Sequence, residues 1–80
     1  MSHASPAPAA LDFQLRGDFI ELDKLLKACA LADSGGAARH LITEGRVRVD
    51  GQVELRKTAK IRAGQHVELD GQAVRVLAAD

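Results

Sequence analysis

The sequence of 80 residues is poor in aromatic side chains, with two phenylalanines, Phe13 and Phe19, and neither tryptophan nor tyrosine. Modules that read single-stranded nucleic acid stack successive bases on exposed aromatic rings. This chain cannot supply such a platform. The absence excludes one common way of reading a nucleic acid, but it leaves open contacts to phosphates and to the shape of a folded polynucleotide.

Cysteine and long apolar runs are scarce as well. Cys29 is the single cysteine, so no internal disulfide can form, whereas small secreted domains usually need several. No apolar run approaches the ~18 residues of a membrane span, and the basic start and apolar stretch of a signal peptide are missing. We therefore expect a cytoplasmic protein without a membrane partner. Cys29 lies on an apolar helix stripe, so we expect it in the core rather than as a reactive thiol.

The residues of a reaction centre are also missing. His40 and His66 stand far apart, with no cysteine pair or carboxylate at ligand spacing, so no metal site is expected. No nucleophile stands beside a base, and no phosphate-loop lysine motif is present. The sequence predicts a protein that is not an enzyme and that holds no cofactor.

Length and composition favour one small domain behind a tail. The first residues are mainly alanine, serine and proline, with little to bury. We expect a flexible tail over residues 1–12 and a single domain over residues 13–80. So short a chain has room for one hydrophobic core and for no deep substrate cavity.

The formal net charge is zero, but the charges are unevenly distributed along the chain. Residues 24–62 carry nine basic and four acidic side chains, or +5, whereas residues 1–23 sum to −3 and residues 63–80 to −2. A local basic field of this kind attracts a polyanion in spite of the overall neutrality.

Apolar spacing predicts two helices in the first half of the chain. The first, from about Glu21 to Ala30, has the i, i+3, i+4, i+7 stripe of an amphipathic helix, formed by Leu22, Leu25, Leu26 and Cys29. The second runs from the N-cap Ser34 to about Glu44 and ends before Gly45, which we expect in the left-handed conformation. Its apolar stripe is Ala38, Leu41 and Ile42. The short connection predicts that the two helices pack side by side.

From Arg46 onward the apolar period changes to two, which predicts two hairpins. A two-residue loop at Asp50-Gly51 would pair Arg48 with Val53 and place a charge on the apolar face. We therefore expect a three-residue loop that pairs Val47 with Val53 and leaves Gly51 left-handed. In the second hairpin, a two-residue loop at Asp70-Gly71 pairs Val67 with Val74. The order of elements predicts an α+β fold, with two packed N-terminal helices followed by a small antiparallel sheet.

The start of the second predicted helix is a candidate anion site. The first amides of a helix lack internal partners, and the helix dipole makes that end positive. Gly35 and Gly36 leave the amides behind Ser34 open to close approach, and Arg39 stands one turn further on. The alternative is that the glycines only permit tight packing of the helix pair.

Further basic residues are expected to extend this site into one surface. Arg46 and Arg48 share the outer face of the first predicted strand, although Arg46 is also placed to pair with Glu54 across the hairpin. The stretch from 56 to 62, which holds Arg56, Lys57 and Lys60, contains no acid. The cluster as a whole carries this interpretation, because single charges on an outer strand face are usually only solvated.

Two lysines of the first predicted helix differ in their surroundings. Lys27 stands four residues after Asp23, a favourable spacing for an ion pair within a helix. Lys24 is freer in the sequence and is therefore included among the candidate contacts. The predicted contacts are Lys24, Ser34, Gly35, Gly36, Arg39, Arg46, Arg48, Arg56, Lys57 and Lys60.

The order of these motifs resembles a known family, the S-four RNA-binding domain, which is named for small-subunit ribosomal protein four. The resemblance covers residues 20–69 and rests on Leu22-Asp23-Lys24-Leu25-Leu26, then Ser34 and Arg39, then Leu41-Ile42-x-x-Gly45-x-Val47-x-Val49-Asp50-Gly51. It implies two helices packed on a small curved sheet, with RNA held by the second helix and the following strand. Ser34 and Arg39 match the family's helix contacts, and Arg46 and Arg48 match its basic positions beside the valines.

The chain departs from the family pattern at three places. Glu21 stands where many members have arginine, Asp50 stands where asparagine is common, and Gln65 replaces a frequent aspartate. The continuation to Gly64 resembles small bacterial members in which the domain stands alone. No catalytic domain accompanies this copy, so the activities of larger members are not expected.

Together these features predict a non-enzymatic module that grips structured or double-stranded RNA, such as ribosomal or transfer RNA, through phosphate contacts. The alternative is a protein-interaction adaptor that uses the same basic face, which the overall neutrality and the acidic flanks favour. A monomer is expected, and the ribosome or another protein is a further candidate partner.

Overall fold

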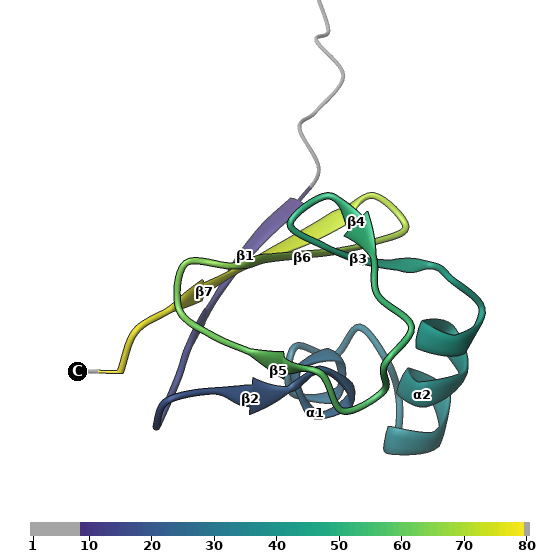
Figure 1. The fold of residues 1–80 in the computed structure, drawn as a ribbon, viewed down its shortest axis with the longest axis horizontal. Helices are drawn as coiled ribbons and strands as arrows, with labels where there is room; N and C mark the ends of the chain where they lie inside the picture. Colours follow the sequence, from purple (N-terminus) through teal and green to yellow (C-terminus); the bar gives the residue numbers. More distant parts are fainter. Residues whose placement is uncertain (1–8, 80) are drawn as a thin grey trace, which may run out of the picture.

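The computed structural model describes residues 9–79, which form two helices and two sheets (Figure 1). The helices are α1 (Leu22–Ala28) and α2 (Gly35–Thr43). The larger sheet has the strand order β1 (Ala9–Gln14), β7 (Gln72–Leu77), β6 (His66–Leu69), β3 (Val47–Val49) and β4 (Gln52–Val53). The smaller sheet pairs β2 (Ile20–Glu21) with β5 (Lys60–Ile61). Neither helix is long and apolar enough to cross a membrane, as far as residues 9–79 are concerned.

The predicted fold, with N-terminal helices ahead of an antiparallel sheet, is wrong in two respects. Strands β1 and β2 precede α1, and β1 pairs with β7 in parallel, so the larger sheet is mixed. Leu11 and Phe13 of β1 do alternate, and they lie opposite Val74 and Val76. The partner strand is at the other end of the chain, and a local apolar period cannot reveal such a pairing.

The boundary predicted for the N-terminal tail also needs correction. Residues 9–12, which the composition assigned to a tail, belong to β1. The alanine and proline residues that precede this strand obscured its short alternation. Residues 1–8 lie outside the described part of the chain.

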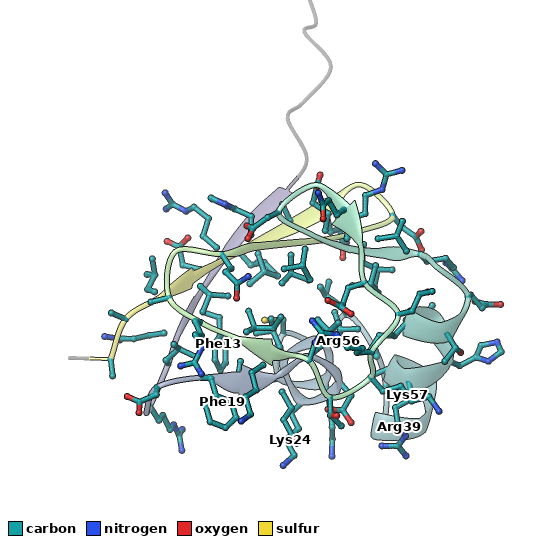
Figure 2. All side chains as sticks on the ribbon, viewed as in Figure 1. Phe13, Phe19, Lys24, Arg39, Arg56 and Lys57 are labelled. Carbon is teal, nitrogen blue, oxygen red and sulfur yellow. The ribbon has the colours of Figure 1, made fainter. Side chains whose placement is uncertain are left out.

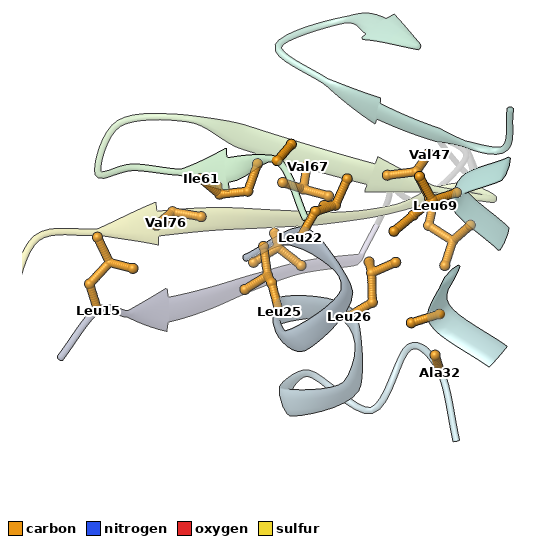
Figure 3. Close-up of a cluster of buried hydrophobic side chains, with 14 residues drawn as sticks. Leu15, Leu22, Leu25, Leu26, Ala32, Val47, Ile61, Val67, Leu69 and Val76 are labelled. Atoms are coloured by element: carbon orange, nitrogen blue, oxygen red, sulfur yellow. The ribbon is translucent and has the colours of Figure 1, made fainter. Parts of the chain in front are cut away.

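One hydrophobic core lies between the helices and the larger sheet (Figure 3). Leu22, Leu25 and Leu26 of α1 are fully buried, as the predicted stripe requires, and Cys29 packs against the same core while remaining partly accessible. A fully buried side chain of this size stabilises the folded state by about 1.5–3 kcal/mol relative to an exposed one. This packing fixes α1 firmly, which matters because α1 positions the basic residues described below.

The predicted ends of α2 are confirmed. Ser34 is the N-cap, and its Oγ accepts a hydrogen bond of 3.1 Å from the amide of Ala37. After the last turn, Gly45 is left-handed, with φ of 78°. The amides of Gly45 and Arg46 donate to carbonyls of the last turn, so the orphan acceptors of the helix end are satisfied locally.

The two hairpins differ in how well the sequence predicts them. The β6–β7 hairpin has the predicted register, with Val67 opposite Val74. The register predicted for β3–β4 is wrong, because Arg48 lies opposite Val53 and the loop is the two-residue turn 50–51. Both residues of this turn are left-handed, the conformation that matches strand twist in a tight hairpin. Strand β4 is a sheet edge where Val53 is 50% exposed, so no core face enforces the register there and the turn geometry decides it.

Candidate nucleic-acid interface

The start of α1 is held by the connection between β4 and β5. The amides of Leu22 and Asp23 donate to the carbonyls of Ala59 and Lys57, at 2.9 and 3.0 Å. The first amides of a helix have no acceptor within the helix, and this connection supplies one for each. The connection therefore runs across α1 beside α2 (Figure 1), and Lys57 reaches the helix pair although it is distant in sequence.

Asp23 ties the two helices together at the same end. Its side chain is only 9% exposed, and its Oδ2 accepts a hydrogen bond of 3.4 Å from Nη1 of Arg39 in α2. Its Oδ1 accepts a bond of 2.8 Å from the amide of Lys24. A buried carboxylate needs such partners, because an unpaired buried charge is costly. The ion pair predicted between Asp23 and Lys27 gives way to this contact with Arg39.

Arg39 reaches Asp23 because Gly35 leaves room for its guanidinium. A β-carbon at position 35 would lie 3.3 Å from Nη1 of Arg39, whereas at Gly36 the nearest neighbour, Oγ of Ser34, would lie at an ordinary 3.9 Å. No hydrogen bond to the amides of Gly35 or Gly36 occurs among residues 9–79. The guanidinium is thus held over the first turn of α2, beside two amides that donate no hydrogen bond within the described residues.

Lys24 and Lys60 lie at the start of α1. Lys24 is paired rather than free, because its Nζ lies 3.0 Å from Oε1 of Glu21. This bond raises the pKa of Lys24 and keeps the amine charged. Lys60 of β5 is directly opposite Glu21 in the small sheet.

The α1 edge is the name we give to the resulting cluster: Lys24, Gly35, Gly36, Arg39, Lys57 and Lys60. Figure 2 shows that Lys24, Arg39 and Lys57 lie along one side of the molecule. Ser34 contributes by capping α2, since its hydroxyl is engaged with an amide of its own helix.

The structure does not bring Arg46 and Arg48 to the α1 edge. Arg46 follows the C-terminal end of α2, at the opposite end from Gly35, and it pairs with Glu44 and Asp70. These hydrogen bonds, that of Asp70 above all, raise the pKa of Arg46. Arg48 is an exposed residue of β3 that lies opposite Glu68 of β6 and Val53 of β4. Both arginines therefore belong to the sheet side of the molecule.

Arg56 adjoins Lys57 but is engaged by an acid. Its Nε and Nη2 donate to the two carboxylate oxygens of Glu54, at 3.0 and 3.1 Å. The bond from Arg56 lowers the pKa of Glu54, and it takes the place of the predicted Arg46–Glu54 pair. A groove of about 370 Å³ lies between Arg56, Thr58, Ala59 and Lys60, so the outer side of this connection is concave beside the α1 edge.

Sequence reasoning missed how three residues shape this region. The spacing predicts an ion pair between Asp23 and Lys27, because the burial of an acid cannot be read from a helical stripe. Arg62 belongs to the acid-free basic stretch, but the sequence assigns no contact to it or to Phe19, whereas Lys60 and Arg62 both lie over the Phe19 ring, 4.9 and 5.7 Å from its centroid. The β2–β5 pair that brings Lys60 and Arg62 to Phe19 has two residues in each strand, which is too short for a periodic signal.

The chain matches a known protein family over most of its length. The family model described as S4 domain matches residues 13–77. The chain belongs to the S4 domain family. The matched range of this S4 domain includes every residue of the α1 edge, and the family resemblance predicted from the sequence is confirmed.

Individual relatives of this S4 domain agree with the family assignment. The Escherichia coli K12 protein named "Putative RNA-binding protein YbcJ" is 49% identical over 59 residues, which cover 74% of this chain and 84% of that protein. YbcJ of Shigella flexneri shows the same identity and coverage. The solution structure of YbcJ from E. coli, described as revealing an αL motif involved in RNA binding, matches with a TM-score of 0.65 and 41% identity, and the match covers 98% of both chains.

Proposed function

We propose that this S4 domain is a non-enzymatic protein that binds structured RNA, such as ribosomal or transfer RNA, and that the RNA phosphates lie on the α1 edge. One observation carries the proposal: Asp23 fixes Arg39 beside the unbonded amides of Gly35 and Gly36, and Lys57 lies alongside. The relatives named or described for RNA binding support the same conclusion.

The chemistry of the α1 edge suits phosphate groups. Backbone amides at a helix start and a guanidinium beside them form charge-assisted hydrogen bonds with phosphate oxygens. Lysines add point charges that follow a polyanionic backbone. Contacts of this kind fix position and orientation on the RNA but carry little information about base sequence. We therefore propose that the domain recognises the shape of a base-paired RNA rather than its base sequence.

The dependence of affinity on salt tests the proposal. If the domain contacts about five phosphates, the logarithm of the association constant should fall with the logarithm of salt concentration at a slope of roughly −3.5 to −4.5. The measurement is a titration of a labelled RNA hairpin at several salt concentrations. Affinity that does not change with salt would contradict a phosphate interface.

Two matched variants test the location of the interface. Lys57→Gln and Arg48→Gln each remove one exposed charge that has no ion pair within residues 9–79, one from the α1 edge and one from β3. We expect K57Q to weaken binding by about fivefold and to reduce the salt slope by about one. R48Q should bind like the unmodified protein. The reverse result would move the interface to the sheet side, where the sequence also predicted contacts.

A further inference from the structure

Phe19 is an exposed aromatic ring in a basic environment. The ring is 40% exposed and lies in the loop just before β2. The cations of Lys60 and Arg62 approach it from β5 and the residue after β5. Two phenylalanines are too few to stack a run of bases, but one exposed ring is enough to stack a single base.

A groove opens beside this ring. It has a volume of about 480 Å³ and is lined by Phe13, Leu15, Phe19, Ile20 and Ala28, with Arg16 among its polar residues. This volume falls within the range of small-ligand sites, and the lining is apolar with a few polar groups, as such sites usually are. Figure 2 shows Phe13 and Phe19 on the same side of the molecule. The groove thus offers a flat apolar ligand one aromatic face and apolar walls.

The charges around the groove favour a flat ligand whose two faces are apolar and whose edge carries negative charge. Arg16, Lys60 and Arg62 bring three positive charges to this region, while Asp18 brings one negative charge. Asp12 also lines the groove, but its carboxylate is paired with Arg75 at 2.9 Å. A nucleobase that carries its own phosphates has the matching chemistry.

Lys60 links the groove to the α1 edge. It lies over the ring of Phe19, which lines the groove, and opposite Glu21, which bonds Lys24. A polynucleotide whose phosphates follow the α1 edge therefore passes the mouth of the groove.

We propose that Phe19 and the adjoining groove receive one unpaired nucleobase of a bound RNA, while Lys60 and Arg62 contact the phosphates on either side of that base. The proposal rests on the proposed RNA-binding function and adds a specificity to it. The domain would favour a paired RNA stem interrupted by an unpaired nucleotide over an uninterrupted stem.

Two RNA hairpins test the inference, identical except that one carries a single bulged nucleotide. Because stacking of one base on an aromatic side chain is expected to change affinity by about five- to a hundredfold, the protein should bind the bulged hairpin at least about fivefold more tightly. Phe19→Leu, which keeps an apolar side chain but removes the ring, should abolish the preference and leave the salt slope unchanged. Val53→Ala, at the exposed sheet edge opposite β1, is the matched control and should keep the preference.

A fluorescent variant gives a second readout. Since the chain has no tryptophan, Phe19→Trp introduces a single emitting residue at the groove. The bulged hairpin should quench its emission through stacking, and the paired hairpin should not. Equal salt-dependent binding of both hairpins, unaffected by F19L, would overturn the base site and leave the phosphate interface intact. Failure to bind either hairpin would overturn both proposals.

Discussion

Asp23 and Arg39 show how one buried acid can direct a basic side chain outward to a ligand. The carboxylate of Asp23 is enclosed by α1, α2 and the β4–β5 connection, and it uses only one guanidinium nitrogen of Arg39. The Arg39 side chain remains 49% exposed, so its other donors face solvent. Asp23 therefore acts as a positioning residue, since it holds the guanidinium in place and does not itself face the proposed RNA.

Replacement of Asp23 separates positioning from simple charge. Asp23→Asn removes a negative charge, so attraction of the whole protein to RNA alone predicts tighter binding. Because Arg39 loses the ion pair that holds it, we expect weaker binding instead, by about three- to tenfold, in the hairpin titration. Unfolding in urea should show a loss of about 1 kcal/mol from the weakened hydrogen bond.

The control for this change is Asp70→Asn. It removes the same charge from an exposed ion pair with Arg46, on the sheet side of the molecule. D70N should bind the hairpin as tightly as the unmodified protein or slightly more so. If D23N tightened binding in the same way as D70N, Asp23 would have no positioning role.

Two departures from the family pattern turn out to contact each other. Oδ2 of Asp50 accepts a hydrogen bond of 3.1 Å from Nε2 of Gln65, and its Oδ1 accepts one of 3.0 Å from the amide of His66. With asparagine at 50 and aspartate at 65, the side chain at 50 would donate and the side chain at 65 would accept. In this chain the side chain at 65 donates and the side chain at 50 accepts. The sequence places these two positions fifteen residues apart, and only the fold shows that a hydrogen bond joins them.

Among the structural elements, the two helices end in the same hydrogen-bonded motif with different residues. After α1, the amide of Ala30 donates to the carbonyl of Lys27 and that of Leu31 to the carbonyl of Leu26. Ala30 must adopt a φ of 59°, as Gly45 adopts 78° after α2. An L-residue with a β-carbon is disfavoured in this conformation by roughly 1–2 kcal/mol.

Exchanging alanine and glycine at these helix ends should have opposite effects. We expect Ala30→Gly to raise the free energy of unfolding by about 0.5–1 kcal/mol, because glycine relieves the backbone strain. Gly45→Ala should lower it by about 1 kcal/mol. A β-carbon at 45 would meet its nearest neighbour at an ordinary 3.9 Å, so a loss there reports the backbone and not a clash. Urea unfolding measures the free energy of unfolding of both variants. A lower value for A30G than for the unmodified protein would contradict the assignment of backbone strain to Ala30.

The helices could be predicted from the sequence because their signals are local. The stripe of Leu22, Leu25 and Leu26 and the cap of Ser34 all lie within a few turns of one another. The strands depend on partners elsewhere in the chain. The alternation around Leu11 identifies a strand only when its partner β7 is known. The register of Val53 follows from the turn rather than from a buried face.

Over the whole molecule, the fold separates the basic residues by location, which sequence density does not show. The excess of positive charge in residues 24–62 predicted one continuous basic surface. In the fold, Arg46 and Arg56 are engaged by acids, and Arg48 lies on the sheet side. The α1 edge retains Arg39, Lys57 and Lys60, which come from separate segments and meet only because the β4–β5 connection caps α1.

The same ion pairs and turn contacts make the stability of the whole fold sensitive to acid. Hydrogen bonds from Arg75, from the amide of His66 and from Arg56 lower the pKa values of Asp12, Asp50 and Glu54, respectively. In the unfolded chain these groups return to ordinary values near 3.9 for aspartate and 4.3 for glutamate. The unfolded state therefore binds more protons than the folded state as the pH falls through this range, and the contribution of each carboxylate to stability is lost.

We expect the free energy of unfolding to depend little on these three groups above about pH 5 and to fall as the pH is lowered from about 5 to 3. Urea unfolding at a series of pH values measures the change. Asp50→Asn removes one of the three carboxylates, so the decline with acid should be shallower in D50N even though its stability at neutral pH is lower. A free energy of unfolding that rose on acidification would contradict the lowered pKa values. If stability declined as steeply with acid in D50N as in the unmodified protein, the contacts of Asp50 to Gln65 and His66 would not be what holds the first hairpin turn to β6.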